Sequence, residues 1–261
     1  MEGMTTMVEI QRNGEVAVLF LERPKVNALS PELVDGIASG LEQVLADPGV
    51  RAVVLASRLG RVFCAGFDLR ELDALSPGEF TRFFDGFAGL YRRIAAGPVP
   101  VVAAVAGHAL AGGAILALAC ERRVFGEGQW GFGLTEVDVG LPLPGGVLEL
   151  LRAATDEATV YEAGALGRVF TPAEAAERRL AHRLVPGPEV LPAALEEARN
   201  LAAKPPRALG EIRRMLRGSL GERIRAADRD VGEMFSRWWR GEESTACRRR
   251  ILERLSAKGG G

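Results

Sequence analysis

The sequence predicts an α/β fold, in which buried strands alternate with helices and crossover connections join successive strands. Residues 16–21, 52–56 and 101–105 are apolar runs of the length of a buried strand. Between them lie segments with helical spacing of apolar residues or with helix-start signals. At 261 residues the chain can bury a large core as one domain, or as one domain with a small appendage.

Turn and cap residues delimit the first elements. Val8–Gln11 and Val16–Leu21 flank Asn13-Gly14, a strong signal for a hairpin. Ser30-Pro31 provides a helix cap followed by proline at the first helical position. The apolar residues that follow recur at helical spacing, and Asp47-Pro48-Gly49 ends the helix.

The next two units repeat a strand, a glycine turn and a helix. Residues 63–69 place a glycine turn after the second buried strand. Ser76-Pro77-Gly78-Glu79 is a capping box that opens a phenylalanine-rich helix. The strand at 101–105 then leads to Gly112-Gly113 and an apolar helix that ends near Cys120.

The C-terminal part of the chain has a different character. The sequence predicts that its last hundred residues are almost wholly helical. Pro205-Pro206 is the expected joint between a core at 1–204 and a C-terminal helical region at 205–261. Helices are expected at 145–151, 157–165, after a capping box at 171–174, and at 190–203, 207–216, 224–239 and 244–255.

Composition excludes several classes of protein. With 33 basic and 34 acidic residues, the chain lacks the positive charge of a nucleic-acid or membrane-surface binder. Its three cysteines are widely spaced, which indicates neither a disulfide framework nor a metal site and favours a reducing compartment. With no signal or transit pattern, we expect a cytoplasmic protein. The uncharged stretch between Arg93 and Glu121 is interrupted by glycines and prolines, unlike a transmembrane helix.

The turn at Gly112 has the features of a site for a negatively charged oxygen. A helix that begins there leaves its first N–H groups without partners, at the positive end of its dipole. Glycine also lets a ligand approach the backbone closely, because no Cβ intervenes. The alternative is a plain core strand and helix, with glycine present only for close packing.

Three segments predict one chemical site. Phe63–Leu69 and Ala111–Gly113 are glycine turns after successive strands, and Gly133–Glu136 carries a carboxylate between glycines. Two backbone N–H groups from such turns can converge on one oxygen. A nearby carboxylate can then move a proton on the adjacent carbon.

These segments resemble the crotonase (enoyl-CoA hydratase/isomerase) superfamily, over nearly the whole chain. The family pattern R-P-x-x-N-A-L is similar to Arg23–Leu29, and F-x-A-G-x-D-[LI] matches Phe63–Leu69. A-x-G-G-G is similar to Ala109–Gly113, with Ala111 at the first glycine position. The resemblance implies a spiral of strand–strand–helix units and a helical C-terminal region that forms homotrimers, often paired into dimers of trimers.

The resemblance also implies roles for particular residues. The backbone N–H groups of Phe67 and Gly112 would form an oxyanion hole for the thioester carbonyl of an acyl-CoA. Arg70 stands where family members often carry a cation for the CoA phosphates. Asp68 also fits a helix N-cap. The residues expected to bind the adenine end of CoA are Lys25, Val26, Ala28, Ala65, Asp68 and Leu69. Coenzyme A enters as part of the substrate, so no separate cofactor and no metal is expected.

The resemblance points to one reaction within the superfamily. Hydratases use two glutamates, and Ile115 stands at the first of these positions while Glu136 occupies the second. Water addition needs one group to activate water and another to protonate the alpha carbon, which one carboxylate serves poorly. A single carboxylate suits the 3,2-enoyl-CoA isomerases of fatty acid metabolism, whose lone glutamate occupies the Glu136 position. The patterns P-x-V-N-x-L-S, A-G-G-x-x-x-A-L-x-C and G-L-x-E also resemble that branch.

Several alternatives stay open at this point. Glu136 could be a surface carboxylate, and Asp138 would share its face if the segment is extended. Asp138 keeps thioester hydrolysis and decarboxylation as candidate reactions. A non-catalytic acyl-CoA-binding member, or an unrelated α/β binding protein, are hypotheses of other classes. The Phe67 side chain and the helix with Phe80–Phe87 could shape an acyl pocket or belong to the core, whereas Trp238-Trp239 is expected to pack.

Overall fold

In the computed structural model, which describes residues 7–258, six strands form the main sheet in the order β1-β2-β3-β5-β7-β10. The first pair is antiparallel and every other neighbour is parallel, so crossover connections join them as predicted. The strands are β1 (Val8–Asn13), β2 (Val16–Leu21), β3 (Ala52–Ser57), β5 (Val101–Val105), β7 (Arg122–Gly126) and β10 (Arg183–Val185).

A second sheet of four short strands lies beside the first. Its order is β4-β6-β8-β9, and β4, β6 and β8 are parallel. Strands β3 and β4, β5 and β6, and β7 and β8 follow one another along the chain, one in each sheet, before the chain turns into helix. These are the expected strand–strand–helix units. The strands are β4 (Val62–Cys64), β6 (His108–Leu110), β8 (Phe132–Gly133) and β9 (Val169–Phe170).

The short strands correct one prediction. The last hundred residues are not almost wholly helical, because β9 and β10 lie among them. A strand of two or three residues is too short to show an alternating pattern, so it forms because a neighbouring strand is present to pair with it. β10, for example, pairs with β7, whose residues lie far away in sequence.

The N-terminal hairpin and the first helix form as the sequence predicts. β1 and β2 form a hairpin in which Asn13 pairs with Val16, and the turn is made by Gly14, at φ +64°, and Glu15. Helix α1 (Pro31–Ala46) begins at the Ser30 cap, whose side chain accepts a hydrogen bond from the Leu33 amide at 3.2 Å. The helix ends at Asp47.

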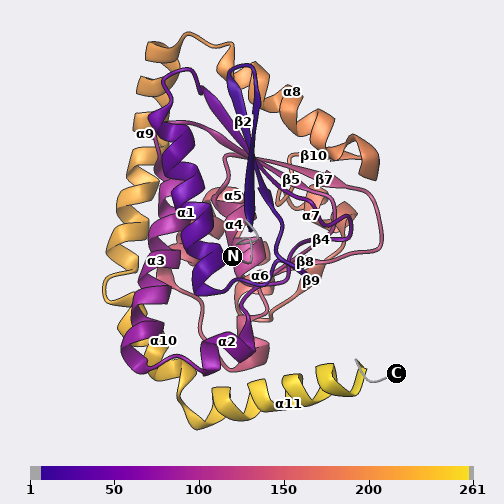
Figure 1. Ribbon diagram of the computed structural model, residues 1–261, viewed down its shortest axis with the longest axis vertical. Coiled ribbons are helices and arrows are strands. Elements are labelled where there is room, and N and C mark those ends of the chain that lie inside the picture. The colour runs from indigo at the N-terminus through magenta and orange to yellow at the C-terminus, as the bar shows by residue number, and fades with distance from the viewer. Residues whose placement is uncertain (1–6, 259–261) are drawn as a thin grey trace, which may run out of the picture.

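Helices cover both faces of the main sheet (Figure 1). Helices α1 and α3 (Pro77–Ala96) pack on one face, and α8 (Val190–Ala202) packs on the other. The predicted capping box of α3 is present, since Ser76 and Glu79 each bind the other's amide. The phenylalanines of α3 are buried in the core.

Shorter helices and two 3₁₀ turns connect the strands between these elements. They are α2 (Leu69–Asp73), α4 (Gly112–Ala119), the 3₁₀ turn η1 (Glu136–Val139), α5 (Gly145–Ala154), α6 (Glu157–Gly164), α7 (Pro172–Glu177) and the 3₁₀ turn η2 (Gly187–Glu189). In the part of the chain that the structure describes, no helix is long and apolar enough to cross a bilayer.

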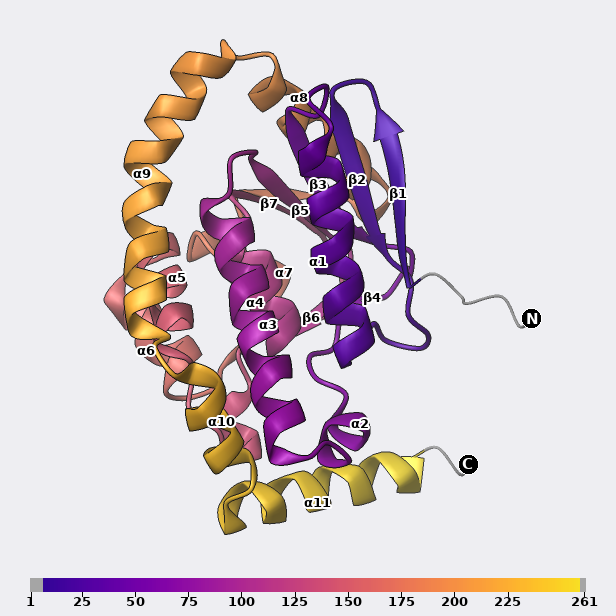
Figure 2. The ribbon, with the colours of Figure 1, turned by 60° about the vertical axis from the view of Figure 1, so that its left-hand side comes forward.

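Three helices form the C-terminal region, and their bounds differ from those that the sequence predicts. α9 (Pro206–Ala227) runs without the expected break and lies along α3 (Figure 2). The break falls instead at residues 228–230, where Asp230 has φ +59°, before α10 (Val231–Trp239). α11 (Glu242–Lys258) then crosses beneath α2 and α10 (Figure 2).

Candidate active site

The two predicted glycine corners meet in the structure. Gly66, at φ +93°, lies in the turn from β4 to α2, and Gly112 begins α4 directly after β6. A Cβ at Gly66 would lie 2.9 Å from the Ala111 Cβ and 3.6 Å from the Gly112 amide nitrogen. The corners are therefore in contact, although some 45 residues of chain separate them.

Each corner has a backbone N–H without an acceptor among the residues that the structure describes. Leu29 pairs with the first corner, because its amide donates to the Gly66 carbonyl at 2.7 Å and its carbonyl accepts from the Asp68 amide at 3.0 Å. The N–H of Phe67, between them, points away from Leu29. Within residues 7–258 neither the Phe67 amide nor the Gly112 amide donates a hydrogen bond to another residue.

Close packing explains the second glycine of this corner. A Cβ at Gly113 would lie 2.2 Å from the Cys64 carbonyl oxygen, so α4 packs directly on the backbone of β4. A Cβ at Gly112 would lie 2.7 Å from Leu29 Cδ1 and 3.2 Å from Phe67 Cε1. The close packing of the alternative interpretation is therefore present at Gly113, and the same packing brings the Gly112 amide beside the Phe67 corner. The site for a negatively charged oxygen stays a prediction. Ala111 adopts φ +46°, a conformation that glycine adopts more readily, at the first glycine position of the motif.

A cavity of about 490 Å³ opens beside these corners. Lys25 and Gly112 are expected site residues that do not line it, although their neighbours Val26 and Ala111 do. Eight predicted site residues line the cavity: Val26, Ala28, Ala65, Phe67, Asp68, Leu69, Arg70 and Glu136. The sequence did not predict the other lining residues, which are Leu110, Ala111, Thr135, Val139, Leu141, Trp239, Ile251 and Leu252.

Glu136 is a buried acid that faces this cavity. It is the first residue of η1 and is 3% exposed, so it is not a surface carboxylate. Neither carboxylate oxygen has a hydrogen-bond partner among the described residues. Burial raises the pKa of Glu136 to about 7, partly opposed by its own backbone amide and reinforced by the charge of Asp138. A carboxyl group with this pKa can both take up and release a proton near neutral pH.

Asp138 does not lie on the same face of the chain as Glu136. We expected it on the face of Glu136 if the segment were extended, but the segment forms a 3₁₀ turn. With three residues per turn, side chains two apart point in different directions. Asp138 is exposed and does not line the cavity.

The other carboxylate of the cavity already has partners. Asp68 caps α2 by accepting a hydrogen bond from the Glu71 amide at 3.2 Å, as predicted for an N-cap. It also pairs with Arg23 at 3.0 Å. Ile115, at the position of a second glutamate, is buried within α4. Glu136 is therefore the one carboxylate lining the cavity that lacks a partner among residues 7–258.

Asn27 supports the loop that borders the cavity, a role that the sequence did not predict. It is buried at φ +49°, and its side chain amide donates to Ser57 Oγ at 2.8 Å and to the Phe63 carbonyl at 2.9 Å. It thereby fixes the loop with Val26 and Ala28 against the β3–β4 connection. The asparagine of the R-P-x-x-N-A-L pattern was the available signal.

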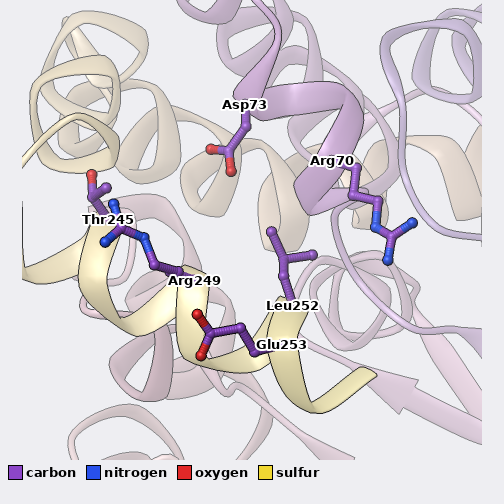
Figure 3. A pocket seen from close by; sticks show the side chains of 6 residues that line it. All are labelled: Arg70, Asp73, Thr245, Arg249, Leu252 and Glu253. Atoms are coloured by element: carbon purple, nitrogen blue, oxygen red, sulfur yellow. The ribbon is translucent and has the colours of Figure 1, made fainter. Parts of the chain in front are cut away.

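The C-terminal helices provide part of the cavity wall. Trp239 packs against Phe80 as expected, and it also lines the cavity. The α3 phenylalanines, candidates for an acyl pocket, are absent from its lining. A second, outer pocket of about 620 Å³ shares Arg70 and Leu252 with the cavity. Figure 3 shows Arg70 and Asp73 on α2 facing the side chains of α11 across it.

Comparisons with known proteins show the family of the chain. The sequence profile of the family described as enoyl-CoA hydratase/isomerase matches residues 11–258. The chain therefore belongs to the enoyl-CoA hydratase/isomerase family, which confirms the resemblance to the crotonase superfamily. A putative enoyl-CoA hydratase of Thermus thermophilus is 40% identical over 200 residues, which cover 75% of this chain and 76% of the relative.

Isomerases are also among the relatives. Human mitochondrial enoyl-CoA delta isomerase 1 is 29% identical over 232 residues, or 88% of this chain and 77% of the relative. The crystal structure of human mitochondrial delta3-delta2-enoyl-CoA isomerase superimposes with a TM-score of 0.92 at 28% identity, covering 97% of this chain and all of that one. A probable enoyl-CoA hydratase from Mycobacterium tuberculosis gives a TM-score of 0.82 at 27% identity, covering 88% and 96%.

Proposed function

We propose that the protein is an enoyl-CoA isomerase, which moves the double bond of an acyl-CoA from carbon 3 to carbon 2. The observation that carries the proposal is that Glu136 is the one carboxylate lining the cavity that has no partner among residues 7–258. Ile115, buried in α4, stands where the resemblance implies the second glutamate of a hydratase. The similarity to the human delta isomerase supports the same reaction.

The two corner amides would stabilise the charge that forms during the reaction. With the thioester oxygen between the N–H groups of Phe67 and Gly112, loss of a proton from carbon 2 places negative charge on that oxygen. Donors held in advance at such an oxygen contribute on the order of a hundred- to a thousandfold in rate each. The positive end of the α4 dipole acts in the same direction.

Glu136 would carry the proton in both steps. Its carboxylate takes a proton from carbon 2, and the electron pair shifts into a dienolate that extends to carbon 4. The resulting carboxylic acid returns the proton to carbon 4, so the double bond now joins carbons 2 and 3. No proton is gained or lost overall, so one carboxyl group with a pKa of about 7 is sufficient.

Substrate binding would use the loops around the cavity mouth. Backbone around Lys25, Val26, Ala28, Ala65 and Leu69 holds the adenine end of CoA, and Arg70 binds the CoA phosphates. The reaction is a proton transfer, so coenzyme A as part of the substrate supplies all that it requires. The proposal includes a homotrimer or dimer of trimers in the cytoplasm, where the three free cysteines, two of them buried, remain reduced.

Hydration is the second candidate, because the Thermus relative is named a putative hydratase. It requires that one group activate water and another protonate the alpha carbon. Ile115 provides neither, so we expect hydration of crotonyl-CoA to be slow.

Assay of both reactions with one pair of variants tests the proposal. We expect the protein to convert 3-hexenoyl-CoA to 2-hexenoyl-CoA, and Glu136→Gln to lower kcat by about a thousandfold, because an amide cannot accept the proton. Asp138→Asn, which removes the exposed carboxylate two residues away, should leave the rate within about twofold. Saturated acyl-CoA should bind to both variants.

Three outcomes contradict the proposal. Rapid hydration of crotonyl-CoA without isomerisation would identify a hydratase. Full function in the Glu136→Gln variant would indicate a non-catalytic acyl-CoA binder. Absence of any affinity for CoA thioesters would exclude both and leave an unrelated activity.

A further inference from the structure

The guanidinium of Arg248 on α11 lies at a junction of three helices. Its Nε and Nη2 donate to Asp73 Oδ1 of α2 at 3.1 and 2.8 Å. Its Nη1 donates to the Trp239 carbonyl of α10 at 2.7 Å and to Ser244 Oγ at 2.6 Å. Arg248 is 4% exposed, so water screens these contacts little. They should stabilise the junction more than an isolated ion pair on the surface would.

Trp239 is held by the same two residues. Its indole Nε1 donates to Asp73 Oδ1 at 3.0 Å, and the Arg248 guanidinium lies 3.9 Å from the centre of its ring. Trp239 lines the cavity and is 2% exposed. Asp73 and Arg248 do not line that cavity, so they act on it through Trp239.

The next turn of α11 completes this side of the cavity. Ile251 and Leu252, three and four residues after Arg248, lie on the same face of the helix and line the cavity with Trp239. At its other end, α11 touches the turn that carries Glu136, since a Cβ at Gly140 would lie 3.0 Å from Ser244 Cα. Helix α11 thus spans from α2, which follows the Phe67 corner, to the turn with the acid.

We propose that Arg248 is a positioning residue, which with Asp73 holds Trp239, Ile251 and Leu252 as the apolar wall that contacts the acyl chain of the substrate. The wall consists of these three side chains, and all three belong to helices that the Arg248–Asp73 pair joins to α2. The proposal rests on the proposed function only in taking the ligand to be an acyl-CoA. It adds that contact with this wall makes the affinity of the site depend on the length of the acyl chain.

The chemistry of arginine suits this role. One planar guanidinium reaches a carboxylate, a carbonyl and a hydroxyl at once and still covers the indole face. A side chain without these donors would fill the space but leave α11 free to shift against α2. The acyl chain would then lose contact with the wall. CoA itself would keep its contacts, because the residues proposed to bind it, from Lys25 to Arg70, lie in the loops and α2 and not on α11.

Binding of saturated thioesters tests the proposal without requiring turnover. Calorimetry would compare CoA, hexanoyl-CoA and octanoyl-CoA with the wild-type protein and with Arg248→Met, which has similar length but no donors. In the wild type we expect each buried methylene to tighten binding by up to about fourfold, so that octanoyl-CoA binds about tenfold more tightly than hexanoyl-CoA. In Arg248→Met this ratio should fall below about threefold, with the Kd of CoA changed less than twofold.

Two further variants separate positioning from general destabilisation. Arg250→Met removes an exposed arginine of the same helix and should keep the wild-type ratio. Asp73→Asn weakens the link from α2 without altering α11 and should also lower the ratio, and the double variant should lose no more than the worse single one, because both remove one link.

A wild-type ratio in Arg248→Met or in Asp73→Asn would overturn the proposal, as would an equal loss of affinity for CoA alone. If Arg248→Met does not fold, the ratio in Asp73→Asn decides. A protein that shows the expected ratios but no isomerase activity would refute the proposed function and leave the wall in place.

Discussion

At the scale of single residues, the buried position of Glu136 changes the acidity of its side chain. In water a glutamate is a weak base with a pKa near 4.5, too acidic to share a proton evenly at neutral pH. Here burial is the main cause that brings the pKa to about 7, and no cation among the described residues pairs with the carboxylate to reverse that shift. Glu136 also lines the cavity, so its carboxyl group lies beside the space that a ligand would fill.

The pH dependence of activity follows from this pKa. Isomerisation begins with proton abstraction, so only the carboxylate form of the free enzyme is active. We expect kcat/KM for 3-hexenoyl-CoA to rise tenfold per pH unit below the pKa and to level off above it, with the midpoint near pH 7. Steady-state rates between pH 5 and 9 measure this. A profile that is level from pH 5.5 to 8 would contradict it.

The same shift gives an independent check through folding stability. The pKa of Glu136 is raised in the folded state, so the folded protein binds more protons than the unfolded chain between about pH 4.5 and 7. Its stabilising contribution is complete below about pH 4.5 and is lost as the pH rises through 7, by up to roughly 3 kcal/mol. Urea unfolding should therefore show Glu136→Gln gaining stability relative to the wild type from pH 5 to pH 8.

At the scale of elements, α4 is the helix on which the site depends. It is only eight residues long and every one of them is buried, so it is apolar on all sides and owes its stability to its neighbours. Its first turn touches the backbone of β4 through Gly113. The contact holds the Gly112 amide beside the Phe67 corner.

Adding one methyl group to α4 should disturb both stability and activity. In Gly113→Ala the new Cβ would meet the Cys64 carbonyl at 2.2 Å, so we expect a loss of about 3 kcal/mol and at least a tenfold fall in kcat as the amide moves. Gly86→Ala is the matched control, because that glycine lies in exposed helix with nothing within 4 Å of the added Cβ. It should gain about 0.5–1 kcal/mol by helix propensity. Thermal unfolding and rate measurements of both variants decide.

At the scale of the whole molecule, α9 fastens the C-terminal helices to the strand core. Arg213 is 5% exposed and donates to Glu121 at 2.8 Å and to the Pro98 carbonyl at 2.7 Å. Arg217 donates to the carbonyls of Ala95 and Ala119, at the ends of α3 and α4. Arg217 thus satisfies carbonyl groups at the C-terminal ends of α3 and α4, and Arg213 binds the loop that follows α3.

Removing the first of these arginines should loosen that attachment. Arg213→Met removes the partner of Glu121 and the donor to the carbonyls of Gly97 and Pro98, so we expect a loss of about 3 kcal/mol in denaturant unfolding. Arg214→Met, on the exposed side of the same helix, removes an ion pair with Glu211 and should change stability by less than about 0.5 kcal/mol. Equal effects of the two variants would show that α9 is held by its apolar face alone.

Prediction from the sequence succeeded where the signal was local. The hairpin at Asn13-Gly14, the Ser30 cap and the capping box at Ser76 depend on contacts between neighbouring residues, and each is present. The break between α9 and α10 was misplaced, because helical spacing continues up to Ala227 and the turn at Asp230 carries no glycine or proline. The strands β9 and β10 were missed because their partners lie elsewhere in the chain.

The sequence by itself determined the family, the N-terminal hairpin, the buried strands β3 and β5 and the helices that precede and follow them, because residue type and spacing encode these. It also predicted Glu136 and the two glycine corners as one site, but it did not predict the short strands β4, β6 and β8 or the strand β7. Only the tertiary structure decided that Glu136 is buried with no partner among residues 7–258 and that Asp138 points elsewhere. It also decided that Trp239 and α11 reach the cavity. These properties arise when segments far apart in the chain exclude water together, and no local pattern records that.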